Sequence, residues 1–164
     1  MPIEHAAVTL SASASGADVN GVARLLIRFS EAVDSRRPAD VAALFAADGL
    51  FKPAEKAIIG RSAIEAFYRQ RLSDPRRTTR HLWSNLLVTP EADGAARIQV
   101  ILSNYAFEPA IMQTEVRLRV GMVTGRCVGA RGDWVFAEHL YERSYALRLP
   151  VDEAIAPVAV GARS

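Results

Sequence analysis

His81 is the residue of this sequence best suited to chemistry, and it lies in a segment of alternating side chains. Over residues 79–89 the alternation places His81, Trp83 and Asn85 on one face of a predicted strand. An imidazole titrates near neutral pH, so it can move a proton in an elimination or an enolisation. We predict that this face points inward and that His81 acts as a general acid or base. The alternative is a half-buried histidine that only hydrogen-bonds across the sheet.

Asp34 is the carboxylate whose position suggests a role in the same chemistry. It ends the first predicted helix, where the helix dipole does not favour a negative charge. An unfavourable position of this kind can indicate a functional residue. The alternative, which local sequence favours, is that Asp34 caps the following helix through the turn at residues 35–37.

The remaining side chains that could do chemistry form no familiar motif. Cys127 is the only cysteine, which rules out an intrachain disulfide framework. His139 lies beside Tyr141 and Tyr145 on a predicted strand, and we expect it at an interface or on the surface. The histidines have no carboxylate at short helical spacing, and the chain has no glycine-rich phosphate loop. We therefore expect neither a metal nor a cofactor.

Arg76, Arg77 and Arg80 form a basic cluster before and within the predicted strand. They could meet an anionic substrate at the mouth of a pocket, but a solvated loop is the simpler interpretation, and we favour it. The whole chain has 20 basic and 18 acidic residues, a net charge of +2. So small an excess is a poor footprint for nucleic acid unless it is concentrated on one face, so we expect no nucleic-acid partner.

Apolar residues spaced by three and four predict three helices in the N-terminal half of the chain. The first is expected to begin at Asp18 as its cap and to end near Asp34. The second begins at Pro38. The third opens with Ser62 and Glu65, which form a capping box.

The second half of the chain has the two-residue period of strands. Two short strands, residues 50–52 and 56–59, precede it, and Asp48 is expected in the turn before them. Four long strands in so short a chain must curl around the helices, which leaves a cone-shaped pocket for a small apolar or aromatic ligand. The long strands are predicted over residues 79–89, 97–107, 115–130 and 134–149.

Five segments of the chain resemble the SnoaL-like branch of the nuclear transport factor 2-like superfamily. The resemblance covers residues 18 to 148, and the order and spacing of the segments are more specific for the fold than for an activity. The segments are Arg28-Phe-Ser-Glu-Ala-Val-Asp34, Ala43-Leu-Phe-Ala-Ala-Asp48, Gly60-Arg-Ser-Ala-Ile-Glu-Ala-Phe-Tyr68, Thr79-Arg-His-Leu-Trp-Ser-Asn85 and Gly132-Asp-Trp134.

The resemblance implies an α+β fold, a cone-shaped α+β barrel with three N-terminal helices packed in a curled, mostly antiparallel sheet. The superfamily includes polyketide cyclases, dehydratases such as scytalone dehydratase, ketosteroid isomerase and epoxide hydrolases. The leading interpretation is therefore a small-molecule pocket protein, a cofactor-independent lyase or isomerase acting on an apolar cyclic or polyketide-like compound.

The resemblance also implies roles for individual residues. The dehydratase branch has an aspartate at the position of Asp34 that would orient the catalytic His81. Asn104 or Tyr105 would hold an oxygen of the ligand. The other expected ligand-binding residues are Phe51, Phe67, Tyr68, Trp83 and Asn85.

The sequence departs from two of these relatives. The steroid isomerase places its general base where this chain has Lys52, before Pro53, and its oxyanion-donating tyrosine where this chain has Phe29. Without base or donor, that mechanism loses its main parts. The dehydratase pattern is also incomplete, because residues 97–107 contain no second histidine.

Two non-catalytic alternatives stay open. The pattern Arg80-His81 followed by Ser84-Asn85 also resembles the β subunits of ring-hydroxylating dioxygenases, which trimerise and support a Rieske-type partner. This chain lacks the longer insertion that those subunits carry before the third helix. The other alternative is a stand-alone ligand-binding module.

The length of 164 residues fits one domain, expected over residues 18–149 with tails at 1–17 and 150–164. No apolar run is long enough to span a bilayer and the start does not resemble a signal peptide, so we expect a cytoplasmic protein with no membrane partner. Leu82, Leu86 and Val88 should make the outer sheet face apolar, which predicts a homodimer. A trimer would instead favour the β-subunit alternative.

Overall fold

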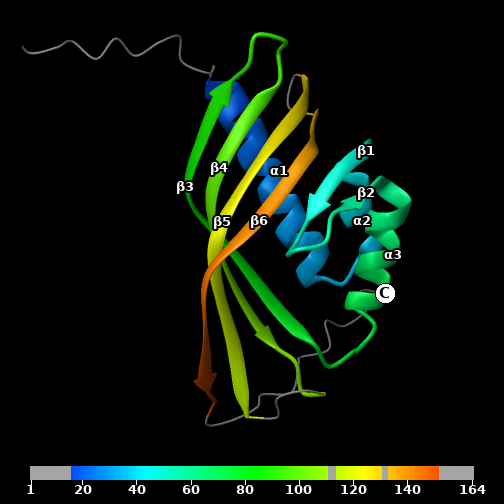
Figure 1. The fold of residues 1–164 in the computed structure, drawn as a ribbon, viewed down its shortest axis with the longest axis vertical. Helices are drawn as coiled ribbons and strands as arrows, with labels where there is room; N and C mark the ends of the chain where they lie inside the picture. The colour runs from blue at the N-terminus through cyan, green and yellow to red at the C-terminus, as the bar shows by residue number, and fades with distance from the viewer. Residues whose placement is uncertain (1–15, 111–113, 131–132, 152–164) are drawn as a thin grey trace, which may run out of the picture.

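The computed structural model describes residues 16–110, 114–130 and 133–151 (Figure 1). Its helices are α1 (Gly16–Asp34), α2 (Pro38–Ala43) and α3 (Arg61–Arg71), which confirms the three predicted helices. Of the predicted tails, the structure describes only residues 16–17 and 150–151. Within the described part, no helix has both the length and the apolar character needed to cross a membrane.

The predicted long strands form the larger part of one sheet with the order β2-β1-β6-β5-β4-β3. Neighbouring strands are antiparallel except for β1 and β6, which are parallel. The α+β class and the mostly antiparallel sheet are therefore confirmed. The strands are β1 (Phe45–Lys52), β2 (Ile58–Ile59), β3 (Thr78–Pro90), β4 (Ala96–Phe107), β5 (Glu115–Ala130) and β6 (Asp133–Pro150).

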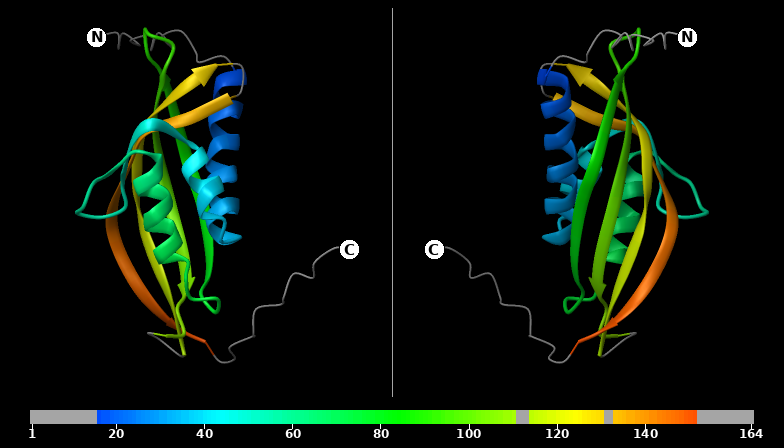
Figure 2. Two further views of the ribbon diagram at one scale, coloured as in Figure 1. Left: turned by 90° about the vertical axis from the view of Figure 1, so that its right-hand side faces the viewer. Right: turned by 90° about the vertical axis from the view of Figure 1, so that its left-hand side faces the viewer.

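The helices lie on one side of the curved sheet (Figure 2). The apolar face of α1 is buried there, and Phe29, 2% exposed, lies at its centre. The ring of Phe29 is 6.3 Å from that of Phe45 on β1 and 5.8 Å from that of Phe136 on β6. Apolar burial of this kind stabilises the helix against the sheet and fixes α1 relative to β1 and β6.

Local signals misplace two helix starts and one turn. α1 begins at Gly16 rather than at Asp18. α3 has Gly60 as its N-cap, at a φ of 87° that suits glycine. Since glycine has no side chain, α3 has no side-chain capping bond, and the Ser62 capping box is wrong. Asp48 lies inside β1, where the register against β6 shifts between Phe45 and Leu50, and not in a turn before the strand.

A β-bulge in β3 changes which side chains face the core. The register against β4 shifts between Ser84 and Leu87, and Asn85 has a φ of 55°, which asparagine tolerates better than most residues. Beyond the bulge, Leu86 and Val88 pack against the core. Their predicted place on the outer face is wrong, because strict alternation ends at the bulge.

The outer face of the sheet nevertheless carries exposed apolar side chains. Leu82 is 52% exposed, and Tyr105 and Leu147 lie in one row across β4, β5 and β6 with Leu118 between them. A patch of this kind favours association with another surface. The homodimer stays a prediction.

Candidate active site

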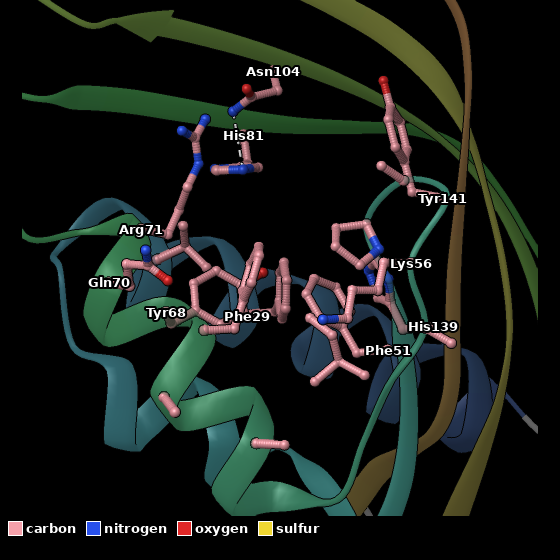
Figure 3. A pocket seen from close by; sticks show the side chains of 18 of the residues that line it. Phe29, Phe51, Lys56, Tyr68, Gln70, Arg71, His81, Asn104, His139 and Tyr141 are labelled. Carbon is pink, nitrogen blue, oxygen red and sulfur yellow. Dashed lines mark hydrogen bonds between the residues drawn. The ribbon is translucent and has the colours of Figure 1, made fainter.

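A cavity of about 880 Å³ is bounded by α3, the β1–β2 connection and the inner face of the sheet (Figure 3). Its volume is in the range of small-molecule sites. The walls combine aromatic rings with imidazole, amide and cationic groups. The aromatic rings and imidazoles include Phe29, Phe51, Phe67, Tyr68, His81 and His139.

His81 and Asp34 form a hydrogen-bonded pair at the wall of this cavity. Nδ1 of His81 is 2.6 Å from Oδ1 of Asp34, and the backbone N–H of His81 donates to Oδ2 at 3.0 Å. The Thr79 hydroxyl donates to Oδ1 at 2.8 Å. Asp34 is therefore held by three donors from β3, and the cap role that local sequence favours does not describe it, since α2 has no side-chain cap.

The environment of Asp34 keeps it ionised. Burial opposes its charge, but hydrogen bonds from His81 and Thr79 and the charge interaction with His81 hold the pKa of the Asp34 carboxyl below its usual value. An ionised carboxylate accepts a proton-bearing donor, so Nδ1 of His81 carries the proton. The lone pair of a neutral His81 is then on Nε2.

Asn104 contacts that second nitrogen from the neighbouring strand. Its Nδ2 lies 2.9 Å from Nε2 of His81, and the two residues are register partners on β4 and β3 (Figure 3). Asn104 is 8% exposed, so its amide has little access to water. With Nδ1 protonated, the Asn104 amide donates to the lone pair on Nε2, so this lone pair is hydrogen-bonded to Asn104 in the structure.

A second β-bulge brings His139 into the same cavity. Arg126 of β5 pairs with Glu138 and Cys127 pairs with Phe136, so Ala137 is an extra residue on β6. Phe136 and His139 consequently face the same, inner side. The expectation of an interface or surface position for His139 is wrong, since the side chain is 2% exposed.

His139 lies among aromatic rings. Its ring stacks on Phe29 at 5.0 Å and meets Phe51 edge-on at 5.4 Å. Neither ring nitrogen has a hydrogen-bond partner in the described part of the chain. Burial lowers the pKa of His139 to about 4, so it is a neutral imidazole near pH 7.

The sequence contained one signal for this bulge. Gly125 lies opposite His139, and a Cβ on Gly125 would be 2.3 Å from the carbonyl oxygen of Glu138. A glycine inside a strand often marks such a close backbone approach. His139 on β6 is thus a second histidine at the wall of the cavity, besides His81.

Some of the predicted site residues line the cavity and others do not. Asp34 lies outside it and supports His81 from behind. Trp83, Asn85 and Tyr105 do not line the cavity either. Asn85 is exposed at the bulge, and Tyr105 is 37% exposed because it follows Asn104 on the strand and so faces the other side. The predicted residues that line the cavity are Phe51, Phe67, Tyr68, His81 and Asn104.

Trp83 instead connects β3 to α1 by a hydrogen bond. Its indole N–H donates to the carbonyl oxygen of Leu26 at 3.1 Å. Replacing Trp83 by Phe removes this bond and part of the packed ring, so we expect the free energy of unfolding to fall by about 1–2 kcal/mol. Urea unfolding measures the change, and Tyr145→Phe, at an exposed outer position, is the matched control. Equal midpoints for the two variants would contradict the expectation.

No group of three or more His, Cys, Asp and Glu side chains is placed to hold a metal ion in the ranges that the structure describes. The polar groups at the cavity wall include His81, which Asp34 supports from behind, the Asn104 amide, the buried His139 and several cations. Such a set can move a proton and orient a polar ligand group.

The fold is shared with solved structures of low sequence identity. Hexachlorocyclohexane dehydrochlorinase (LinA) Type2 has a TM-score of 0.72 at 16% identity, over 88% of this chain and 96% of that chain. A candidate scytalone dehydratase from Novosphingobium aromaticivorans has a TM-score of 0.70 at 19% identity, over 88% and 95%. A Catenulispora acidiphila protein in complex with S-DNPA has a TM-score of 0.65 at 21% identity, over 77% and 93%.

The sequence itself matches a family model. A comparison with curated proteins finds no match. The model described as a SnoaL-like domain matches residues 15–139, which span α1 to the middle of β6 and include His81, Asp34 and Asn104. The chain therefore belongs to the SnoaL-like domain family of the nuclear transport factor 2-like superfamily.

Proposed function

We propose that this protein is a cofactor-independent lyase or isomerase that removes a proton next to a carbonyl group of a small cyclic compound. The observation that carries this proposal is the hydrogen-bonded pair of His81 and Asp34 at the wall of the aromatic cavity. In an Asp–His pair the carboxylate fixes the imidazole tautomer and stabilises the imidazolium that forms during proton transfer.

The geometry suggests how the pair would act in a dehydration. A bound ketone takes the place of the amide at Nε2, and Nε2 accepts a proton from the carbon next to the carbonyl. The Asn104 N–H that is released can then donate to the carbonyl oxygen, where negative charge develops. The electron pair of the broken C–H bond forms the C=C bond, the C–O bond on the next carbon breaks, and the imidazolium returns its proton to the leaving hydroxyl as water.

The names of the structural neighbours support this class of reaction. A dehydratase and a dehydrochlorinase each perform an elimination, and both structures share the fold of this chain. At 16–19% identity they do not assign a substrate. The aromatic walls at Phe51, Phe67 and Tyr68 fit a flat apolar ring.

Proton exchange tests the proposal without requiring a known substrate. 2-Tetralone in D₂O exchanges the hydrogens next to its carbonyl, and NMR measures the rate with and without protein. Loss of water from 3-hydroxy-1-tetralone, followed as formation of 1-naphthol, tests the complete elimination. We expect the protein to accelerate the exchange, His81→Gln to return it to the buffer rate, and Asp40→Asn, at an exposed carboxylate on α2, to leave it unchanged.

Acceleration that survives in His81→Gln would contradict the proposed role. Binding of the tetralones without any exchange would instead support the ligand-binding alternative, since the cavity would then hold a ring without acting on it.

A further inference from the structure

A cluster of arginines forms one end of the cavity around a buried carboxylate. Oε1 of Glu108 lies 2.8 Å from Nη2 of Arg71 and 2.9 Å from Nε of Arg77. Nη2 of Arg119 is farther away, 3.5 Å from Oε2. The side chains of Glu108 and Arg77 are 5% and 9% exposed. Arg77 therefore belongs to the interior and not to the solvated loop expected from the sequence.

The charges of this cluster do not balance. Three guanidinium groups face one carboxylate, which leaves two positive charges in excess. Burial lowers the pKa of both Arg77 and Arg119, and the positive charge of Arg71 adds to this effect. An excess of positive charge at a partly buried site is unfavourable, and a bound anion would relieve it.

The arginines of this cluster line the cavity, whereas Glu108 does not. Arg71, Arg77 and Arg119 line it together with Lys56, and none of its described lining residues is Asp or Glu. A guanidinium has five N–H donors in a planar fork that fits a carboxylate. The loose contact of Arg119 with Glu108 leaves donors of Arg119 available to a ligand.

Arg119 also lies in line with the proton-transfer pair. His81 pairs with Asn104 across β3 and β4, and Asn104 pairs with Arg119 across β4 and β5. All three line the cavity, so they form one inward-facing row over three strands. Adjacent strands are about 4.8 Å apart, so the row spans about 10 Å, close to the length of a two-ring compound. Figure 3 shows Arg71 directed from α3 toward the side of the cavity that holds His81 and Asn104.

We infer that the ligand of this cavity is a small cyclic carboxylic acid, whose carboxylate binds Arg119 and Arg71 and whose ring lies against the aromatic walls. The carboxylate would set the distance between the anchored end of the ligand and Nε2 of His81. Placing the reacting carbon at His81 rests on the proposed function, whereas binding of the carboxylate does not depend on it.

Calorimetry with a matched pair of probes tests the inference. 2-Naphthoate and 2-naphthamide share the ring system and differ in charge. We expect the wild-type protein to bind the naphthoate about 10- to 100-fold more tightly than the amide, as a charge-assisted pair predicts. Arg119→Gln should lower the naphthoate affinity about 10-fold or more and leave the naphthamide affinity nearly unchanged.

Three further variants keep the outcomes distinct. Arg97→Gln, at an exposed position on β4, removes the same charge away from the cavity and should bind both probes as the wild type does. Arg119→Gln should fold, because Glu108 still pairs with Arg71 and Arg77 in that variant. If it does not, Arg71→Gln, at a half-exposed position, should also lower the affinity for naphthoate. His81→Gln should retain the preference for naphthoate even where it abolishes proton exchange.

Two results would overturn the inference. One is an equal affinity for both probes, or no binding of naphthoate, in the wild-type protein. The other is an equal loss of both affinities in Arg119→Gln, which would mean that Arg119 supports the shape of the cavity and not the anion. Failure of the tetralone exchange with the naphthoate preference intact would reject the proposed reaction alone.

Discussion

Replacing Asp34 by Asn should lower the rate of proton exchange about 1,000-fold while the protein stays folded. Asp34 accepts from Nδ1 and from the backbone N–H of His81 on its two oxygens. An asparagine has one oxygen and one NH₂ group, so one of these two donors must face another donor. The backbone N–H cannot adjust, whereas the imidazole can move its proton to Nε2. The base would then have its lone pair on the wrong nitrogen.

A double-mutant cycle separates this effect from a general loss of structure. The exchange of 2-tetralone is measured for Asp34→Asn, His81→Gln and the two combined. Because the carboxylate acts through the imidazole, the double variant should be no slower than His81→Gln. An exchange rate in Asp34→Asn equal to that of the wild type would contradict the pairing. ¹⁵N NMR of the ring reports the tautomer directly and should shift in Asp34→Asn.

The order of helices and strands could be predicted from periodicity, because apolar spacing depends on residues that are neighbours in the sequence. The faces of the strands could be predicted only as far as the first bulge. Asn85 and Ala137 each add one residue to a strand, and each reverses the sides of the residues that follow. A bulge depends on the backbone of the partner strand, which a period of two does not contain.

The same limit explains the site. Local sequence favours a cap role for Asp34, yet its partner His81 is 47 residues away and reaches it only after β3 packs on α1. The pairing was available from the family resemblance and not from spacing. Glu108 and the arginines that surround it come from α3, the α3–β3 connection, β5 and the segment after β4, so no local pattern joins them. Charged groups gather there because the topology brings these ends together.

His139, which alternation places outside, should make the stability of the protein depend on pH. Its pKa is about 4 when folded against about 6.5 when unfolded, so between these values the unfolded chain binds the additional proton. The contribution of neutral His139 to stability is therefore fully present above pH 6.5 and is lost as the pH falls toward 4. We expect His139 to account for a loss of about 2 kcal/mol at pH 5 and about 3 kcal/mol at pH 4.

His139→Leu isolates this contribution, because leucine has a similar volume and does not titrate. Near pH 7 the variant should be about 1 kcal/mol more stable, since it removes two buried nitrogens that have no partner in the described structure. Its advantage in urea unfolding should widen to about 4 kcal/mol at pH 4. The pKa values of Asp34 and Glu108 are lowered, so the contributions of these carboxylates to stability are also lost in acid, but this loss is the same in both proteins. Parallel pH profiles for the two proteins would mean that the pKa of His139 does not change on folding. The description of His139 as a neutral imidazole without a partner would then be wrong.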